Sequence, residues 1–251
     1  MKNLVLQSLL LVGIASQATG CIITSGDDDG GGGELAVVTA EWSFRDVRQD
    51  GSTAVETDCP AGFNTVAMYN QEIDRSGRPV GSPIIDLFDC IDFRHDSAPL
   101  PATVYETWLE VTTNGGGSVY AQSLAAEVDV VNSDKTFKAD IVNNGGYFQL
   151  GWDLRDAGGR ALDCADVAEL DGIEIHATLQ SDDTLITDQF DCERGFDVTA
   201  ALIEGSYAVS INAFQDGPND VSISDPTNLP TQIIRDRNQV TELGTVTIVI
   251  P

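Results

Sequence analysis

Polar and apolar residues alternate with a period of two through most of the chain after residue 34. The clearest stretch is residues 104–113, where one phase holds Tyr105, Thr107, Leu109 and Val111 and the other holds Glu106, Trp108 and Glu110. Alternation of this kind places one phase on a core and the other in water, as in an antiparallel sheet. Turn-forming clusters such as Asn114–Gly117 separate these stretches, and the single short helical pattern covers Ala161–Leu170.

The chain contains two copies of one unit. The run from Trp42 to Asp46 recurs 110 positions later, and the alternating residues 63–69 align with 173–179 at the same offset. The later segment that contains Phe88-Asp89-Cys90 and Leu100, Tyr105 and Val119 recurs at an offset of 102. We expect tandem units at 35–142 and 147–251, joined by the turn-prone residues 143–146. The alternative is one large β domain whose internal similarity arose by chance.

Short strands with regular turns in each copy predict an all-β chain of two tandem antiparallel β-sandwiches. Residues 202–209, with a leucine, a glycine turn and a tyrosine, and the later strand Gly244–Ile250 resemble prealbumin-like and other immunoglobulin-like modules. The first copy keeps Leu100 and Tyr105 but has Thr103 in place of the glycine. The resemblance implies a fold and no particular activity.

The N-terminus has the layout of a secretory signal, with Lys2, a mainly apolar run over residues 4–14, and small residues before Cys21. The apolar run is too short for a stable transmembrane span. The residues from Ala18 to Cys21 resemble the bacterial lipobox, although leucine is usual in place of Ala18. The resemblance implies a signal peptide at residues 1–20 and a lipid on Cys21. The alternative is an ordinary signal peptide with an incidental cysteine.

Residues 21–34 are the lipidated cysteine and an acidic, glycine-rich linker that contains Asp27–Asp29 and Gly30–Gly33. Such a segment has too little apolar surface to fold and favours a hydrated spacer. Ile22 in place of aspartate favours the outer membrane, by resemblance to enterobacterial sorting rules. The complete layout resembles surface lipoproteins of the myxobacterial type. This resemblance implies a cell-envelope protein that meets the membrane through its N-terminal lipid.

The charge of the chain is strongly one-sided, with 13 Lys and Arg against 40 Asp and Glu and a net charge of −27. Removal of residues 1–20 takes away only Lys2 and leaves 12 basic and 40 acidic side chains, a balance of −28. Such a charge repels nucleic acid and anionic membrane surfaces and favours cationic partners. The alternative is an acidic surface adapted to solvent, salt or calcium.

Four cysteines remain once Cys21 is assigned to the lipid, namely Cys59, Cys90, Cys164 and Cys192. In an exported protein we expect these four to form disulfides. The register of the repeat selects Cys59–Cys90 and Cys164–Cys192 from the three possible pairings. The alternative is a zinc site, which the lack of any CxxC spacing and the spread over two copies disfavour.

The three tryptophans have different expected positions. Trp42 and Trp152 open equivalent strands, and we expect both in the core. Trp108 lies on the outward phase of its strand, and its counterpart in the second copy is Ser210. An exposed tryptophan is typical of a partner contact. We therefore expect Trp108 either at such a contact or between the two copies.

An Arg-Asp pair follows each of the two core tryptophans, Arg45-Asp46 in the first copy and Arg155-Asp156 in the second. We expect each pair to form a local ion pair beside the core. The alternative is that both pairs belong to a patch that contacts a ligand.

The sequence contains no GxSxG, HExxH or Walker-type motif. We expect both histidines on the surface, His95 in a loop and His176 on an outward phase. The chain is therefore expected to be a non-enzymatic module for surface binding, adhesion or envelope assembly, with an envelope protein or glycan as partner and no cofactor. The alternative is an enzyme or enzyme accessory with an acidic or calcium-loaded loop. Carboxylates in Gln180–Asp183 and Gln215–Asp220 could supply oxygen ligands to Ca²⁺.

Overall fold

The computed structural model describes residues 35–215 and 221–251. Within these ranges, the regular structure consists of strands and three short 3-10 helices, η1 (Cys90–Asp92), η2 (Cys164–Asp166) and η3 (Cys192–Arg194). The helical pattern at Ala161–Leu170 forms no α-helix, because Ala161–Leu162 is a strand and η2 follows it. The all-β class expected from the alternating pattern is confirmed.

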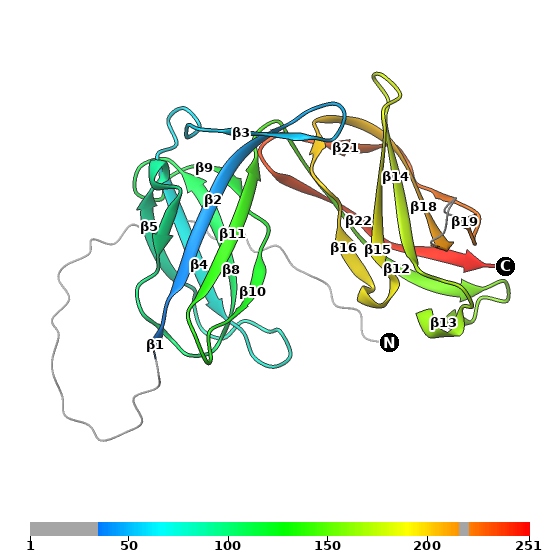
Figure 1. Cartoon of the computed structure of the whole chain (residues 1–251), viewed down its shortest axis with the longest axis horizontal. Helices are drawn as coiled ribbons and strands as arrows, with labels where there is room; N and C mark the ends of the chain where they lie inside the picture. Colours follow the sequence, from blue (N-terminus) through cyan, green and yellow to red (C-terminus); the bar gives the residue numbers. More distant parts are fainter. Residues whose placement is uncertain (1–34, 216–220) are drawn as a thin grey trace, which may run out of the picture. The chain divides into compact units, whose positions relative to one another are not determined.

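The first sandwich has two layers, with β2 and β11 in one layer and β4 and β8 in the other (Figure 1). The β2 sheet contains β2 (Val38–Val47), β3 (Thr53–Glu56), β6 (Arg94–Asp96) and β11 (Lys135–Val142). The β4 sheet contains β4 (Thr65–Glu72), β5 (Ile84–Asp89), β8 (Val104–Thr112), β9 (Val119–Gln122) and β10 (Ala126–Asp129). The short strands β1 (Leu35–Ala36) and β7 (Leu100–Pro101) pair with each other.

The second sandwich repeats this arrangement with β12 and β22 in one layer and β14 and β18 in the other (Figure 1). The β12 sheet contains β12 (Gly145–Asp156), β13 (Ala161–Leu162), β16 (Phe196–Val198), β17 (Leu202–Ile203) and β22 (Gln239–Ile250). The β14 sheet contains β14 (Gly172–Leu179), β15 (Leu185–Asp191), β18 (Gly205–Gln215), β19 (Val221–Ser222), β20 (Thr227–Asn228) and β21 (Gln232–Ile234). Strand β2 pairs in parallel with β11, and β12 pairs in parallel with β22, so the two copies share their topology.

Each sandwich encloses its own hydrophobic core between its two sheets. The largest side chains of the first core include Trp42, Phe44, Met68, Phe88 and Tyr105. Those of the second core include Phe148, Trp152, Ile175, Phe190 and Tyr207. These residues occupy the alternate positions that the period of two assigns to the inside, because successive side chains of a strand point to opposite faces.

The expected offset of 110 for residues 63–69 is wrong. Phe88 lies opposite Val66, and its counterpart Phe190 lies opposite Ile173, so the offset in β4 and β14 is 107. Tyr69 therefore corresponds to His176 and not to Leu179. The error arose because the loop before β14 is shorter than a constant offset requires. The offset of 102 holds in β5 and β8, where Tyr105 and Tyr207 pair with equivalent residues.

The residues that join the copies are fixed by hydrogen bonds to both of them. The Asn144 side chain accepts a bond from Val47 N at 2.7 Å and donates one to Val47 O at 2.9 Å. A Cβ on Gly145 would lie 2.0 Å from the carbonyl oxygen of Leu202. The chain therefore needs glycine at this point, because neighbouring backbone approaches too closely for a side chain.

Candidate binding surface on the first sandwich

Trp108 lies on the outward side of β8 and stacks on Tyr69 of the neighbouring strand β4. The two residues are direct cross-strand partners, and their ring centroids are 4.9 Å apart with planes inclined by 3°. The Tyr69 hydroxyl donates a hydrogen bond to Glu110 Oε2 at 2.9 Å. Burial raises the pKa of Tyr69 to about 12, and the Glu110 carboxylate adds to the increase, so the hydroxyl stays protonated as a donor.

Exposed aliphatic side chains of the edge strand β5 continue this surface. Ile85 lies opposite Tyr69, and Leu87 lies opposite Ala67, which places both on the same side of the sheet as Trp108. Their side chains are 50% and 51% exposed, respectively. We call this surface, formed by Tyr69, Ile85, Leu87, Trp108 and Glu110, the aromatic face. It combines two stacked rings with exposed aliphatic groups, a composition that is typical of contact surfaces.

At the equivalent positions, the second sandwich presents polar side chains on this face. The positions of Tyr69, Trp108 and Ile85 are taken there by His176, Ser210 and Thr187. His176 Nε2 lies 2.9 Å from Glu174 Oε2, and His176 Nδ1 lies 3.1 Å from Thr187 Oγ1. Since the same fold is built with a polar network at these positions, the fold itself does not require the aromatic face.

The same network includes the residues that replace Leu87 and Glu110. Gln189 Nε2 donates to Glu174 Oε1 at 3.2 Å, and Asn212 Nδ2 lies 3.5 Å from Glu174 Oε2. The polar groups of this face thus bond to one another within the sheet. On the aromatic face, by contrast, Trp108 Nε1 is covered from solvent and has no hydrogen-bond partner in the described part of the chain.

All the charged residues in the strands of the β4 sheet are acidic. Its five strands contain no Lys, Arg or His, and their seven acidic residues are Glu72, Asp86, Asp89, Glu106, Glu110, Glu127 and Asp129. By strand register, Glu106, Glu110 and Asp89 share the side of Trp108. Glu127 and Asp129 of β10 share it too, because they lie opposite Glu106 and Val104. The aromatic face is therefore rimmed by carboxylates.

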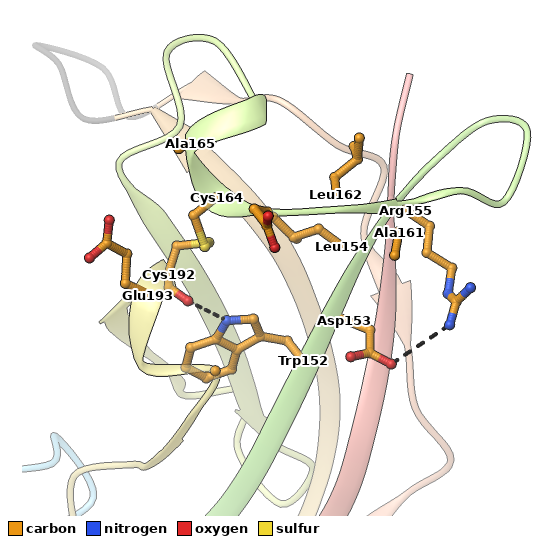
Figure 2. A pocket seen from close by; sticks show the side chains of 12 residues that line it. Trp152, Asp153, Leu154, Arg155, Ala161, Leu162, Cys164, Ala165, Cys192 and Glu193 are labelled. Carbon is orange, nitrogen blue, oxygen red and sulfur yellow. Dashed lines mark hydrogen bonds and ion pairs between the residues drawn. A yellow bond between two sulfur atoms is a disulfide. The ribbon is translucent and has the colours of Figure 1, made fainter. Parts of the chain in front are cut away.

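A second candidate is a hollow of about 470 Å³ beside Trp152 and the Cys164–Cys192 disulfide (Figure 2). Its polar lining includes Glu193 and the Arg155–Asp153 pair, whose closest atoms are 3.9 Å apart. The indole nitrogen of Trp152 donates to the Cys192 carbonyl at 3.0 Å and is not free for a ligand (Figure 2). The hollow therefore offers carboxylates and one guanidinium around a structural disulfide.

The expected disulfides Cys59–Cys90 and Cys164–Cys192 are both present. Trp42 and Trp152 are buried in the two cores, as expected. Trp108 does have an outward strand phase, but it is half-buried because it packs on Tyr69 of its own sheet. Cys21 lies outside the described residues.

The expected local Arg-Asp ion pairs are wrong. Arg45 Nε lies 2.8 Å from Asp140 of β11, while Asp46 accepts a hydrogen bond from Asn143 at 3.2 Å. In the second copy Asp156 pairs with Arg160 at 3.2 Å. The reason is that adjacent residues of a strand point to opposite faces, so Arg45 meets a side chain of the neighbouring strand instead.

The histidines occupy strands. His95 lies in β6, where its ring stacks on Phe88 at 4.4 Å between centroids, and not in a loop as expected. His176 lies on β14 in the polar network.

The sequence predicted two loops that could supply carboxylates to Ca²⁺. In the first loop, Asp182 accepts a hydrogen bond from Thr184 N at 3.1 Å. In the second loop, residues 216–220 lie outside the described part of the chain.

Among residues 35–215 and 221–251, no group of three or more His, Cys, Asp or Glu side chains is arranged to hold a metal ion. Over the same ranges, no helix has both the length and the hydrophobicity needed to cross a bilayer.

No protein-family model matches the sequence, and no curated protein matches it. Among solved structures, a leucine-rich repeat protein from Bacteroides thetaiotaomicron aligns with 86% of this chain at 11% identity and a TM-score of 0.38. The chain spans about a quarter of that protein, since 26% of its length is covered.

Two bacterial surface proteins align over most of their own lengths. A minor pilin of Streptococcus agalactiae aligns at 13% identity and a TM-score of 0.30, with 86% of this chain and 96% of the pilin covered. A protein of Bacteroides ovatus assigned as an adhesin aligns at 10% identity and a TM-score of 0.29, with 84% and 88% covered. These similarities are too low to transfer a function, so the function has to be argued from this chain's own residues.

Proposed function

We propose that this chain is an exported, lipid-anchored binding protein of the bacterial cell envelope that holds a partner on its aromatic face and catalyses no reaction. The observation that carries the proposal is the contrast between equivalent faces of the two sandwiches. One presents Tyr69, Trp108 and exposed aliphatic groups, and the other presents a hydrogen-bonded polar network. A surface tryptophan that the fold does not need is best explained by a contact with a partner.

The N-terminal sequence supports the proposed location. The residues from Ala18 to Cys21 fit a lipidation site, and Ile22 favours the outer membrane in a surface lipoprotein of the myxobacterial type. The two disulfides are typical of proteins that fold in an oxidising, exported compartment. Metabolic labelling with a fatty-acid analogue tests the anchor, because the wild-type chain should be labelled and Cys21→Ser should not. Labelling of neither protein in the native host would contradict it.

The binding function is tested by exchanging the aromatic pair for its counterparts in the second sandwich. The double variant Tyr69→His/Trp108→Ser carries residues that the same fold already accommodates. The purified wild-type chain and the double variant are compared for binding to envelope fractions of a strain that lacks the protein. We expect the double variant to bind about tenfold or more weakly, since aromatic contacts dominate interfaces. A matched control is Leu185→Ser, which removes an apolar side chain that is 56% exposed on the second sandwich. Equal binding by the double variant would reject the aromatic face as the contact.

A further inference from the structure

We propose that the partner held on the aromatic face is a cationic polypeptide segment in which Lys or Arg alternates with apolar side chains. This inference rests on the function proposed above and adds the chemistry of the partner. It follows from three features of the β4 sheet: the sign of its charges, their mutual placement, and the groups that remain free to bond.

The negative charge of the first sandwich is concentrated on this sheet. The β2 sheet carries both signs and pairs them, with Arg94 and Lys138 at 2.8 Å and 3.2 Å from the Glu41 carboxylate. The β4 sheet has carboxylates and no basic residue in any of its strands. Excess charge on one sheet of a sandwich attracts a partner of the opposite sign and accelerates its association.

Two of these carboxylates face each other in a way that costs stability. Glu106 of β8 and Glu127 of β10 are direct cross-strand partners. Like charges directly opposite on neighbouring strands destabilise a sheet. A bound Lys or Arg between them would convert the repulsion into two attractions. The equivalent of Glu106 in the second sandwich is Ala208, so the fold does not need an acid at this position.

The accessible polar groups of the aromatic face match a partner that donates hydrogen bonds, because the one unpaired donor of the aromatic pair, Trp108 Nε1, is covered from solvent. The Tyr69 hydroxyl donates to Glu110, and the Gln71 amide donates to the backbone carbonyls of Glu72 and Val80. Carboxylates accept hydrogen bonds, whereas Lys and Arg side chains donate them and accept none. The rings of Trp108 and Tyr69 also attract cations, and Ile85 and Leu87 offer apolar contact to the side chains between them.

These features disfavour the other classes of partner. The carboxylate rim would repel anionic glycans, nucleic acid and anionic lipid. A neutral glycan could stack on Trp108, but it would gain nothing from the concentrated charge or from the Glu106–Glu127 pair. The charge pattern therefore separates a cationic polypeptide from a neutral glycan.

The test is calorimetric titration of the purified chain with three probes: a short peptide that alternates Lys and Leu, the same peptide with Glu for Lys, and a neutral β-linked glucose oligosaccharide. We expect the Lys peptide alone to bind. Its affinity should fall by about tenfold in Trp108→Ser. The double variant Glu106→Gln/Glu127→Gln should weaken it similarly and flatten its dependence on NaCl, because fewer charges are then screened. Melting curves of all variants establish that each is folded.

A matched charge control removes two acids elsewhere, in Glu56→Gln/Glu193→Gln, both of which are exposed outside the β4 sheet. This control should bind the Lys peptide within about twofold of wild type, because screening limits the reach of exposed charges. If the control weakens binding as much as Glu106→Gln/Glu127→Gln does, the attraction is diffuse and the inference is overturned. It is also overturned if none of the three probes binds.

Two outcomes distinguish a failure of the cationic partner from a failure of the proposed function. If the oligosaccharide binds, Trp108→Ser abolishes that binding, and the Lys peptide does not bind, then the cationic partner is overturned. The aromatic face would remain a binding surface. Retention of envelope binding by Tyr69→His/Trp108→Ser would instead overturn the proposed function itself.

Discussion

The indole Nε1 of Trp152 donates a hydrogen bond to the backbone carbonyl of Cys192 at 3.0 Å. The same bond joins Trp42 to Cys90 at 2.9 Å in the first sandwich. In both copies a core tryptophan of one sheet is thus tied to the disulfide that follows a strand of the other sheet. This shared bond is physical evidence for the duplication, because it depends on backbone geometry as well as on residue type.

Replacement of either tryptophan by phenylalanine should destabilise the fold, and Trp42→Phe should cost more than Trp152→Phe. The Cys192 carbonyl keeps a second donor, Gly195 N–H at 3.2 Å, when Trp152 is lost. A buried carbonyl that loses its donor costs about 1–3 kcal/mol, and an ordinary hydrogen bond contributes about 1 kcal/mol. Urea denaturation at constant pH measures the difference. Equal losses for the two variants would show that packing of the ring dominates.

Removal of either disulfide should destabilise its own sandwich. The bonds Cys59–Cys90 and Cys164–Cys192 span 31 and 28 residues. The chain-entropy model assigns about 3–4 kcal/mol to each loop of this length. The double variant Cys164→Ala/Cys192→Ala should therefore lower the unfolding free energy by about that amount, measured in guanidinium chloride. Peptide mapping without reduction provides the control, and any link between the two pairs would contradict the assignment.

The alternating pattern was sufficient to predict the all-β class and the inside positions of β8 and β18. Tyr105 and Tyr207 lie on the phase expected for the core, and their hydroxyls donate to Pro101 O at 3.0 Å and Ile203 O at 2.8 Å. The offset of 102 also held, because no insertion separates β5 from β8 relative to the second copy. Cys90 and Cys192 share this offset, and each has one other cysteine in its own copy, so both disulfides were predictable as well.

The partners of individual side chains were not predictable in the same way. Arg45 pairs with Asp140, a residue brought beside it by the parallel pairing of β2 with β11. No periodicity in either segment encodes that pairing. The stack of Tyr69 on Trp108 was missed because a constant offset assigned Tyr69 to Leu179. A register fixed on Phe88 and Phe190 would have matched Tyr69 with His176.

Asn238 should be required for the connection between the copies. Its buried side chain accepts a bond from Val142 N and donates one to Gln122 O, both at 2.7 Å. Asn238→Gly preserves its left-handed backbone, at φ 58°, and removes both side-chain bonds. We expect a loss of about 1–3 kcal/mol in chemical denaturation, since the buried Val142 N and the partly buried Gln122 O lose their partners.

The neighbouring residue supplies the control for this variant. Arg237 has the same left-handed backbone, at φ 61°, but it is exposed and its guanidinium lies 5.3 Å from the Tyr120 ring centroid. Arg237→Gly should cost about 1 kcal/mol or less, the usual contribution of an accessible cation–π contact. If the two glycine variants were equally stable, the Asn238 side chain would not hold the junction.

Asp188 should destabilise the folded chain at neutral pH. Burial raises the pKa of Asp188 above its ordinary value of 3.8, although the Ala200 backbone N–H, at 2.9 Å from Oδ2, opposes the shift. An acid whose pKa is raised by folding binds its proton more tightly in the folded state. Stability is therefore lost as the pH rises from about 3.8 through the raised pKa, where only the folded form still holds the proton.

Asp188→Asn removes this ionisation and keeps an oxygen that can accept the Ala200 bond. We expect the variant to melt at a higher temperature than wild type at pH 7, and the gain should vanish below about pH 3.8, where the aspartic acid is neutral in both states. Because the chain carries a net charge of −27, loss of any acid reduces repulsion, so exposed Asp225→Asn is the control. Asp86, which occupies the same place in the first sandwich and also has a raised pKa, should respond in the same direction. A gain for Asp188→Asn that equals the gain for Asp225→Asn at every pH would assign the effect to net charge and not to burial.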